Sequence, residues 1–341
     1  MALVFPPPST ARAARLHFRY NRAMRIAVYG SGAVGGYFGA RLAQTGQEVI
    51  FIARGEHLQA MQTSGLRIDS LNGDLHLEQV RASDDPRRVG EVDFILVGVK
   101  AWQVPEAALA MRPLVGQDTL VIPLQNGVDA PAQLAAALGS QHATGGLCQI
   151  SVYRAAPGYL RHVGIEPRIV FGDLNNRPSQ RLEDLRQAFE QAAVTASVPD
   201  DIHAALWRKF LFIAAVSGVG AVTRLPVGAI RSIPETRQML EQALRETYAV
   251  ARRRKIALDE GIVAATLSAI DGIAPDVIPS MQRDIQEGHP SELGSQNGAV
   301  VRMGLESGIP TPTHAFIYAS LLPQELIARR DLLDTPAINY P

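Results

Sequence analysis

The sequence lacks the residues on which several common kinds of protein depend. It has one cysteine, Cys148, in 341 residues, so it can form neither an intramolecular disulfide nor a cysteine-rich metal site. No two of its eight histidines have the close helical spacing of a zinc site, and no apolar run reaches the roughly 20 residues of a membrane span. We therefore expect no metal and no membrane, and we expect the most apolar stretch, residues 210–222, to be a buried helix.

A surplus of charge is missing as well. Basic and acidic residues number 33 each, so the composition gives no sign of the basic surface that binds nucleic acid or anionic membrane. A small molecule is the expected partner. The single cysteine favours a reducing cytoplasm as the location.

Lysine is scarce, because only three of the 33 basic residues are lysine and the others are arginine. Where lysine is kept, a compact ammonium that can lose a proton is a plausible requirement, and arginine cannot meet it. Lys255 ends a run of arginines and is interpreted as a solvated helix end. Lys100 and Lys209 are therefore candidate functional residues.

The first 23 residues contain four arginines, three consecutive prolines and no acidic residue. Such a composition occurs in transit peptides, but no clear cleavage signal and no secretory apolar core are present. We expect residues 1–23 to be a disordered extension, or the result of a start assigned too early, with Met24 as the functional start.

From Met24 the chain alternates short β-branched runs with stretches at helical spacing, which is typical of a parallel sheet. Residues 25–29 and 48–52 are predicted strands, and residues 33–45 between them are a predicted helix. The turn between the first strand and the helix has the sequence Gly30-Ser31-Gly32-Ala33-Val34-Gly35.

Each glycine of this turn has its own function in a dinucleotide site. Gly30 makes the tight turn, Gly32 lets the backbone approach a pyrophosphate, and Gly35 lets the helix pack on the strand. The amino end of the helix attracts the anion. A glycine pattern of this kind is weak evidence alone, but within a βαβ unit it predicts dinucleotide binding.

The residue after the second strand bears on the choice of cofactor. NAD-selective sites place a carboxylate there to bind the ribose 2′-hydroxyl, whereas this chain has Arg54. A guanidinium can pair with the 2′-phosphate of NADP, so we predict NADPH. The alternatives are that Arg54 is an ordinary solvated loop residue, or that nearby Glu56 supplies the carboxylate.

Two polar residues follow the next predicted strands. Lys100 ends the strand at residues 92–99, and Asn126 follows the strand at residues 119–123. Ligands of open α/β sheets bind at this carboxyl edge, so both are candidates for the site. Asn126-Gly127 taken alone is also an ordinary turn signal.

The order and spacing of several segments resemble the ketopantoate reductases (2-dehydropantoate 2-reductases), relatives of the 6-phosphogluconate dehydrogenase-like enzymes. The resemblance runs from about Met24 to about residue 325. Besides the glycine turn, which continues to Gly36, its segments are Val99-Lys100-Ala101-Trp102-Gln103, Gln125-Asn126-Gly127-Val128, Trp207-Arg208-Lys209-Phe210, Ser280-Met281-Gln282-Arg283-Asp284, Ser291-Glu292 and Asn297-Gly298.

The resemblance implies an α/β Rossmann-type dinucleotide-binding domain, then an all-α domain, with the substrate between them. Independently, strand signals fade after residues 194–198, and residues 202–216, 235–254 and 261–270 have helical patterns. We expect an NADP-binding domain over residues 24–199, a helical substrate and dimerisation domain over 200–330, and a tail at 331–341. By analogy with the family, a homodimer is possible.

The resemblance also implies the reaction. The family reduces the C2 carbonyl of ketopantoate with NADPH, giving pantoate for coenzyme A synthesis, and Lys209 corresponds to the general acid. Glu292 corresponds to the carboxylate that accepts a hydrogen bond from the substrate's C4 hydroxyl, and Ser280 to a serine that contacts its carboxylate. Lys100 and Asn126 correspond to residues that line the nicotinamide and the reacting end of the substrate.

Simpler readings exist for two of these residues. Lys209 could be a surface helix lysine, although Trp207, Phe210 and Phe212 surround it with apolar residues in the sequence. Glu292 could be an acid at the start of a helix, since Pro290-Ser291-Glu292 resembles a helix amino end.

The chain departs from the best-studied branch of the family at three asparagines. Ile213, Ser217 and Val227 stand at those positions, and only Ser217 keeps a polar group that could bind substrate. Lost hydrogen-bonding groups change which substrate is recognised. The open alternatives are a reductase of a related 2-oxo acid, a 3-hydroxyacid dehydrogenase of the 6-phosphogluconate type, and a catalytically quiet NADP-binding regulator.

Overall fold

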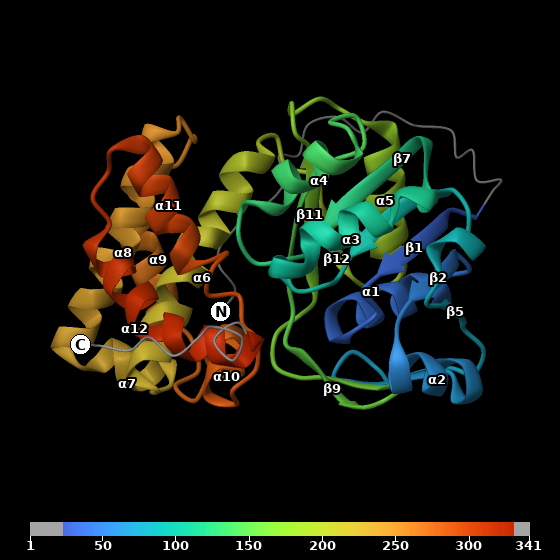
Figure 1. Cartoon of the computed structure of the whole chain (residues 1–341), viewed down its shortest axis with the longest axis horizontal. Coiled ribbons are helices and arrows are strands. Elements are labelled where there is room, and N and C mark those ends of the chain that lie inside the picture. Colours follow the sequence, from blue (N-terminus) through green and yellow to red (C-terminus); the bar gives the residue numbers. More distant parts are fainter. Residues whose placement is uncertain (1–22, 331–341) are drawn as a thin grey trace, which may run out of the picture.

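A computed structural model describes residues 23–330 of the chain. The predicted tail at 331–341, and all of the predicted amino-terminal extension except Ala23, lie outside these residues. Figure 1 shows a part built from sheets and helices beside a part built from helices alone, with helix α6 (Ile202–Thr223) at their junction. The predicted fold class is confirmed.

The central sheet is parallel, as predicted. Its strands are β1 (Arg25–Tyr29), β2 (Glu48–Ile52), β5 (Arg81–Ser83), β6 (Val92–Val97) and β7 (Val115–Pro123), in the spatial order β5-β2-β1-β6-β7. The chain changes direction across the sheet between β1 and β6. At such a switch point the carboxyl ends of the strands leave a crevice for a ligand.

Helices cover both faces of this sheet. Val28 and Phe51 pack in one apolar cluster with α1 (Ala33–Gln44) and α5 (Gln180–Gln191), whereas Ala27 and Ile50 pack in another with α3 (Val104–Ala110) and α4 (Ala130–Leu138). Adjacent residues of one strand belong to different clusters because successive side chains of a strand point to opposite faces of the sheet. Helix α2 (Gly55–Ser64) follows β2, and short 3-10 turns lie at Pro86–Arg88, Ala101–Gln103 and Arg112–Leu114.

Two smaller sheets complete this part of the molecule, and the sequence patterns predicted little of either. One has the order β4-β3-β10-β9, from β3 (Leu66–Ser70), β4 (Leu75–Leu77), β9 (Val152–Ala156) and β10 (Tyr159–His162). The other is β12-β11-β8, from β8 (Thr144–Gln149), β11 (Arg168–Asp173) and β12 (Thr195–Ser197), with β8 and β11 antiparallel. Only the strand predicted at residues 194–198 has a counterpart there, in β12.

The helical part begins after β12, on the far side of Pro199. After α6 come α7 (Val227–Ser232), α8 (Pro234–Arg253), α9 (Ile262–Asp271), α10 (Ser280–Gln286), α11 (Asn297–Ser307) and α12 (Pro312–Arg329). The helices predicted at residues 235–254 and 261–270 correspond to α8 and α9, each displaced by one residue at its ends. We keep the division into two domains near Pro199 as a proposal.

Helix α6 differs from its prediction in length. The segments predicted at residues 202–216 and 210–222 form one helix that passes through Gly218 and Gly220. A β-carbon on Gly218 would lie 2.4 Å from Nδ2 of Asn297, so the glycine makes room for a buried amide rather than ending the helix. Glycine in a helix usually costs about 1 kcal/mol, and here close packing explains its presence.

Helix α6 also corrects the expectation that no apolar run is as long as a membrane span. Among the described residues it is the one helix long and apolar enough to cross a membrane. Most of its length is buried against the rest of the protein. That burial is typical of the core helix of a globular protein.

Candidate active site

The glycine turn joins β1 to α1 in the predicted arrangement. Gly30 has a φ of +92°, and a β-carbon there would lie 2.5 Å from the backbone nitrogen of Val99. At Gly35 a β-carbon would lie 2.3 Å from the carbonyl oxygen of Gly30, whereas at Gly32 it would meet no atom within 4 Å. The turn is therefore closed against the protein at Gly30 and Gly35 and open at Gly32, where an anion can approach the amino end of α1.

Beside this turn the surface is hollowed into a cleft of about 260 Å³. Gly30, Ser31 and Gly32 line it, and so do Arg54 after β2 and Arg154 on β9. Both arginines are exposed, which is also expected of an ordinary solvated loop arginine. Both nevertheless line the cleft beside the glycine turn. Sequence reasoning missed Arg154, because no local pattern marks which residue of β9 reaches the glycine turn.

His57 connects the glycine turn to the strands behind the cleft. Its Nδ1 accepts a hydrogen bond from the backbone N–H of Gly158 at 3.0 Å, so its Nε2 carries the proton and donates to the carbonyl of Ser31 at 2.7 Å. Burial lowers the pKa of His57. The neutral His57 ring therefore holds the backbone of Ser31, next to the expected anion site, through a hydrogen bond.

Lys209 lies inside the protein, which excludes the surface-lysine alternative. It is 8% exposed, and its Nζ donates to the carbonyl of Cys148 on β8 at 2.5 Å. Trp207 and Phe210 pack against each other edge to face on the same helix. Because burial disfavours the charged form, the pKa of Lys209 is lowered. A buried lysine with a lowered pKa is a candidate proton-transfer group.

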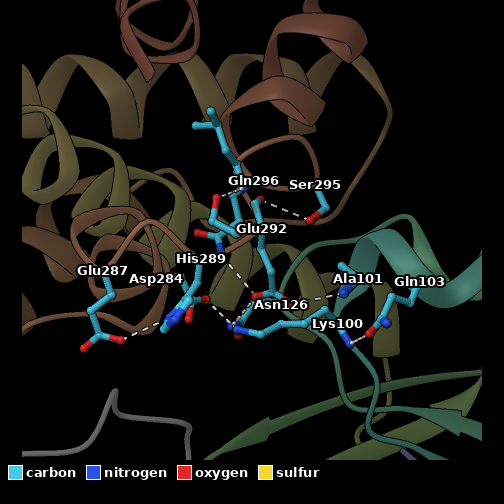
Figure 2. Close-up of polar contacts among 12 residues, drawn as sticks. Lys100, Ala101, Gln103, Asn126, Asp284, Glu287, His289, Glu292, Ser295 and Gln296 are labelled. Carbon is cyan, nitrogen blue, oxygen red and sulfur yellow. Dashed lines mark hydrogen bonds and ion pairs between the residues drawn. The ribbon is translucent and has the colours of Figure 1, made fainter. Parts of the chain in front are cut away.

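Glu292 bridges the two parts of the molecule. Its Oε1 accepts from the backbone N–H of Ala101 at 3.2 Å, and its Oε2 accepts from Nδ2 of Asn126 at 3.0 Å (Figure 2). The amide of Gln296 adds a longer contact to Oε2 at 3.4 Å. Glu292 is 6% exposed, and its charge raises the pKa of Lys209 against the larger lowering effect of burial. It does not start a helix, since α11 begins at Asn297.

Lys100 also lies where the two parts of the molecule meet. Its ammonium pairs with the carboxylate of Asp284 on α10 (Figure 2). Ser280 is the first residue of α10, one turn before Asp284, and it is exposed. The structure thus brings Lys100, Asn126 and Glu292 together, with Ser280 one helical turn from the ion pair. Asp284 ends the segment at residues 280–284 that resembles the family, but no sequence pattern indicates that it pairs with Lys100.

Ser217 is fully buried on α6, and Asn297 packs against the same helix, since its Nδ2 donates to the carbonyl of Ala214. Among the described residues, Ser217 Oγ, Gln296 Oε1 and Asn297 Oδ1 are buried without a hydrogen-bond partner. Buried polar atoms of this kind cost about 1–3 kcal/mol each unless something pairs with them. Of the other two altered positions, Ile213 is half-buried on the Lys209 face, and Val227 is fully buried in the apolar core of the helical part.

Within the described residues, no group of three or more His, Cys, Asp or Glu side chains could hold a metal ion. The arrangement brings together three groups with possible chemical roles. These are a buried ammonium, a buried carboxylate fixed by three donors, and an anion site at a helix amino end.

Comparison with known proteins agrees with this geometry. The family model for "Ketopantoate reductase PanE/ApbA" matches residues 26–176, and the model for its C-terminal part matches residues 201–325. A PanE/ApbA family ketopantoate reductase from Ralstonia eutropha JMP134 superimposes with a TM-score of 0.82 and 33% identity, covering 90% of this chain and 100% of its own.

Two further relatives are informative. A 2-dehydropantoate 2-reductase of Mesorhizobium japonicum is 28% identical over 311 residues, which is 85% of this chain and 94% of the relative. D-mandelate dehydrogenase, solved with NADH and anilino(oxo)acetate, has a TM-score of 0.82 at 23% identity and covers 90% of this chain and 99% of its own. The second likeness concerns the fold alone.

Proposed function

Because the chain belongs to the ketopantoate reductase family, whose members are oxidoreductases, we propose that it reduces the C2 carbonyl of ketopantoate to a hydroxyl with NADPH. One observation carries the proposal. The Lys209 ammonium on α6 and the Glu292 carboxylate in the segment before α11 are both buried, and the charge of Glu292 raises the pKa of Lys209 against the larger lowering effect of burial. A buried acid beside a fixed hydrogen-bond acceptor suits the reduction of a carbonyl that carries a hydroxyl nearby.

The residues around the glycine turn fit a dinucleotide. The open backbone at Gly32 and the amino end of α1 would hold the pyrophosphate. Arg54, with Arg154 opposite it, would pair with a 2′-phosphate. When bound, the cofactor supplies the hydride. The chain's residues must then supply the proton and hold the substrate.

Lys209 is the proposed proton donor. As hydride reaches C2, the carbonyl π electrons move to oxygen, and the ammonium stabilises that growing negative charge before Nζ–H gives its proton to it. The product is the C2 hydroxyl and a neutral amine, which regains a proton from solvent. The carbonyl of Cys148 holds Nζ in place. A positioned acid contributes ~10²–10⁴-fold to the rate of such a step.

Glu292 is the proposed acceptor for the substrate's C4 hydroxyl. Its two oxygens are held by Ala101 and Asn126, so the carboxylate has a defined direction. Lys100 and Ser280 are the proposed partners of the substrate carboxylate, with Asp284 keeping the ammonium of Lys100 where the two parts of the molecule meet. A substrate without a suitable hydroxyl would leave the Glu292 charge poorly paired, and this discriminates strongly between substrates.

The pH dependence follows from the direction of the Lys209 pKa. Reduction needs protonated Lys209, so kcat for reduction should fall as pH rises through its lowered pKa, below the usual lysine range. The reverse oxidation needs the neutral amine and should rise over the same interval. Initial rates of reduction and of oxidation, measured from pH 6 to pH 10 at steps of about half a pH unit, check this expectation. Parallel profiles would contradict the assignment.

A substrate panel tests the function itself. We expect purified protein to oxidise NADPH, followed by its absorbance, with ketopantoate, and much more slowly with branched 2-oxo acids that lack the hydroxyl. Failure to turn over any of them while still binding NADPH would favour the catalytically quiet regulator. Activity confined to 3-hydroxy acids and NADP would favour the 6-phosphogluconate dehydrogenase type.

A second substrate class is favoured by the half-buried Ile213 on the Lys209 face. An apolar side chain there suits a more apolar 2-oxo acid. Replacing Ile213 by asparagine should shift the ratio of kcat/KM values toward ketopantoate by about tenfold, equivalent to one hydrogen bond of roughly 1–1.5 kcal/mol. An unchanged ratio across the same panel would show that this position does not select the substrate.

A further inference from the structure

The carboxyl-terminal end of α12 carries a buried carboxylate that the proposed reaction does not use. Glu325 is 5% exposed, and its two oxygens accept the backbone N–H of Ser291 at 3.0 and 3.1 Å. The Ser291 hydroxyl donates to the same carboxylate. Ser291 directly precedes Glu292, so these bonds fix the backbone from which the substrate-binding carboxylate projects.

Arg329, one turn further along α12, completes the arrangement. Its Nε donates to Glu325 at 2.5 Å, and a terminal nitrogen donates to the carbonyl of Ser291 at 3.0 Å. Ser291 is thus held through its N–H, its hydroxyl and its carbonyl. These contacts restrict both the backbone and the side chain of the residue next to Glu292.

The same guanidinium also contacts the sheet-containing part of the molecule. It lies over the ring of Trp102, 4.8 Å from its centre. Trp102 belongs to the 3-10 turn that follows Lys100, and it is next to Ala101, whose N–H donates to Glu292. Arg329 therefore contacts both segments that meet at Glu292, one from each part of the molecule.

From this geometry we propose that Glu325 and Arg329 are positioning residues for substrate binding. They orient Glu292 through Ser291 and hold the turn of Lys100 and Ala101 against it through Trp102. The inference rests on the proposed function, since it assumes that Glu292 binds the substrate. A buried ion pair is weak evidence for stability, because its desolvation cost offsets most of its attraction. A role in geometry explains better why the pair is kept.

The chain offers a matched control on α8. Glu241 and Arg245 form an ion pair with the same i, i+4 spacing, and they are exposed and remote from Ser291. Glu241→Gln therefore reports the loss of an ion pair of the same type without a change at the site. Exposed pairs contribute about 0–1 kcal/mol, so this variant should behave as the parent.

The test compares Glu325→Gln with Glu241→Gln. Glu325 accepts from the N–H and the hydroxyl of Ser291 and from Nε of Arg329, and the single oxygen of an amide can accept at most two of these three bonds. We therefore expect kcat/KM for the 2-oxo acid to fall by about tenfold to 10²-fold, as for a catalytic group misplaced by about 1 Å. The KM for NADPH should change by less than about twofold, because the glycine turn is untouched. Glu325→Asp, which keeps the charge, should recover part of the loss.

A second readout does not depend on turnover. Amide hydrogen exchange at Ala101, followed by mass spectrometry, should be faster in Glu325→Gln than in the parent and unchanged in Glu241→Gln. If Glu325→Gln does not fold, Trp102→Ala takes its place, because Trp102 is 40% exposed. Its exchange at Ala101 is then compared with that of the parent and of Glu241→Gln. Parent-like exchange at Ala101 in both variants would overturn the positioning role. If exchange at Ala101 is faster in Glu325→Gln but the parent protein reduces no 2-oxo acid, the proposed reaction is refuted and the positioning role is not.

Discussion

Replacing Lys209 by alanine is expected to lower kcat for the 2-oxo acid by ~10²–10⁴-fold, the usual contribution of a positioned acid. The reason is that the buried ammonium of Lys209, whose pKa is lowered by burial, is the proposed proton donor. Affinity for NADPH should stay nearly unchanged, since Lys209 lies on α6 and not at the glycine turn. Stopped-flow reduction and NADPH fluorescence titration measure the two quantities.

Arginine substitutions at two lysines separate charge from proton transfer. Lys209→Arg keeps a positive charge but cannot give up a proton, so it should be nearly as inactive as Lys209→Ala. Lys255→Arg is the matched control, because Lys255 is exposed at the end of α8. Near-normal turnover of Lys209→Arg would show that Lys209 acts only through its charge.

Replacing Arg54 by aspartate should change the choice of cofactor. Losing a charge-assisted bond of about 1.5–3 kcal/mol raises the KM for NADPH by about tenfold to 10²-fold, and the new carboxylate adds repulsion toward the 2′-phosphate. The KM for NADH should change little or fall, because aspartate can bind a ribose 2′-hydroxyl. Steady-state kinetics with both cofactors give the ratio.

Two further variants make this result specific. Arg154→Ala should raise the KM for NADPH less than Arg54→Asp does, as expected for a second cation lining the same cleft. Arg177→Asp, an exposed arginine remote from the cleft, should leave both constants unchanged. Equal changes for NADPH and NADH in Arg54→Asp would remove Arg54 from phosphate recognition.

The features that sequence reasoning predicted correctly are those with a local physical cause. The glycine turn follows from the spacing of three glycines between a strand and a helix, and the structure has the parallel β1-β2 pair on either side of it. The position of Lys209 inside the protein followed from its apolar neighbours and from the rarity of lysine. The antiparallel β8-β11 pair had no such signal, because β8 contains two adjacent glycines and lacks the run of apolar residues that marks β1 and β2.

The contacts that complete the candidate site could not be predicted from sequence. Asp284, Arg154 and Glu325 reach the site only because α10, β9 and α12 pack where they do. Their own surroundings in the sequence are those of ordinary surface residues. The alternative interpretation of Glu292 as an acid at a helix start is excluded, because α11 begins at Asn297 and the carboxylate accepts from the backbone N–H of Ala101 instead.

The transfer of hydride to C2 is tested most directly with NADPH that carries deuterium at the transferred position of the nicotinamide. If Lys209 donates the proton and the cofactor the hydride, the pantoate formed from ketopantoate should contain one deuterium, bonded to C2, as seen by mass spectrometry and NMR. Unlabelled pantoate, or no pantoate from a protein that binds NADPH, would contradict the proposed reaction.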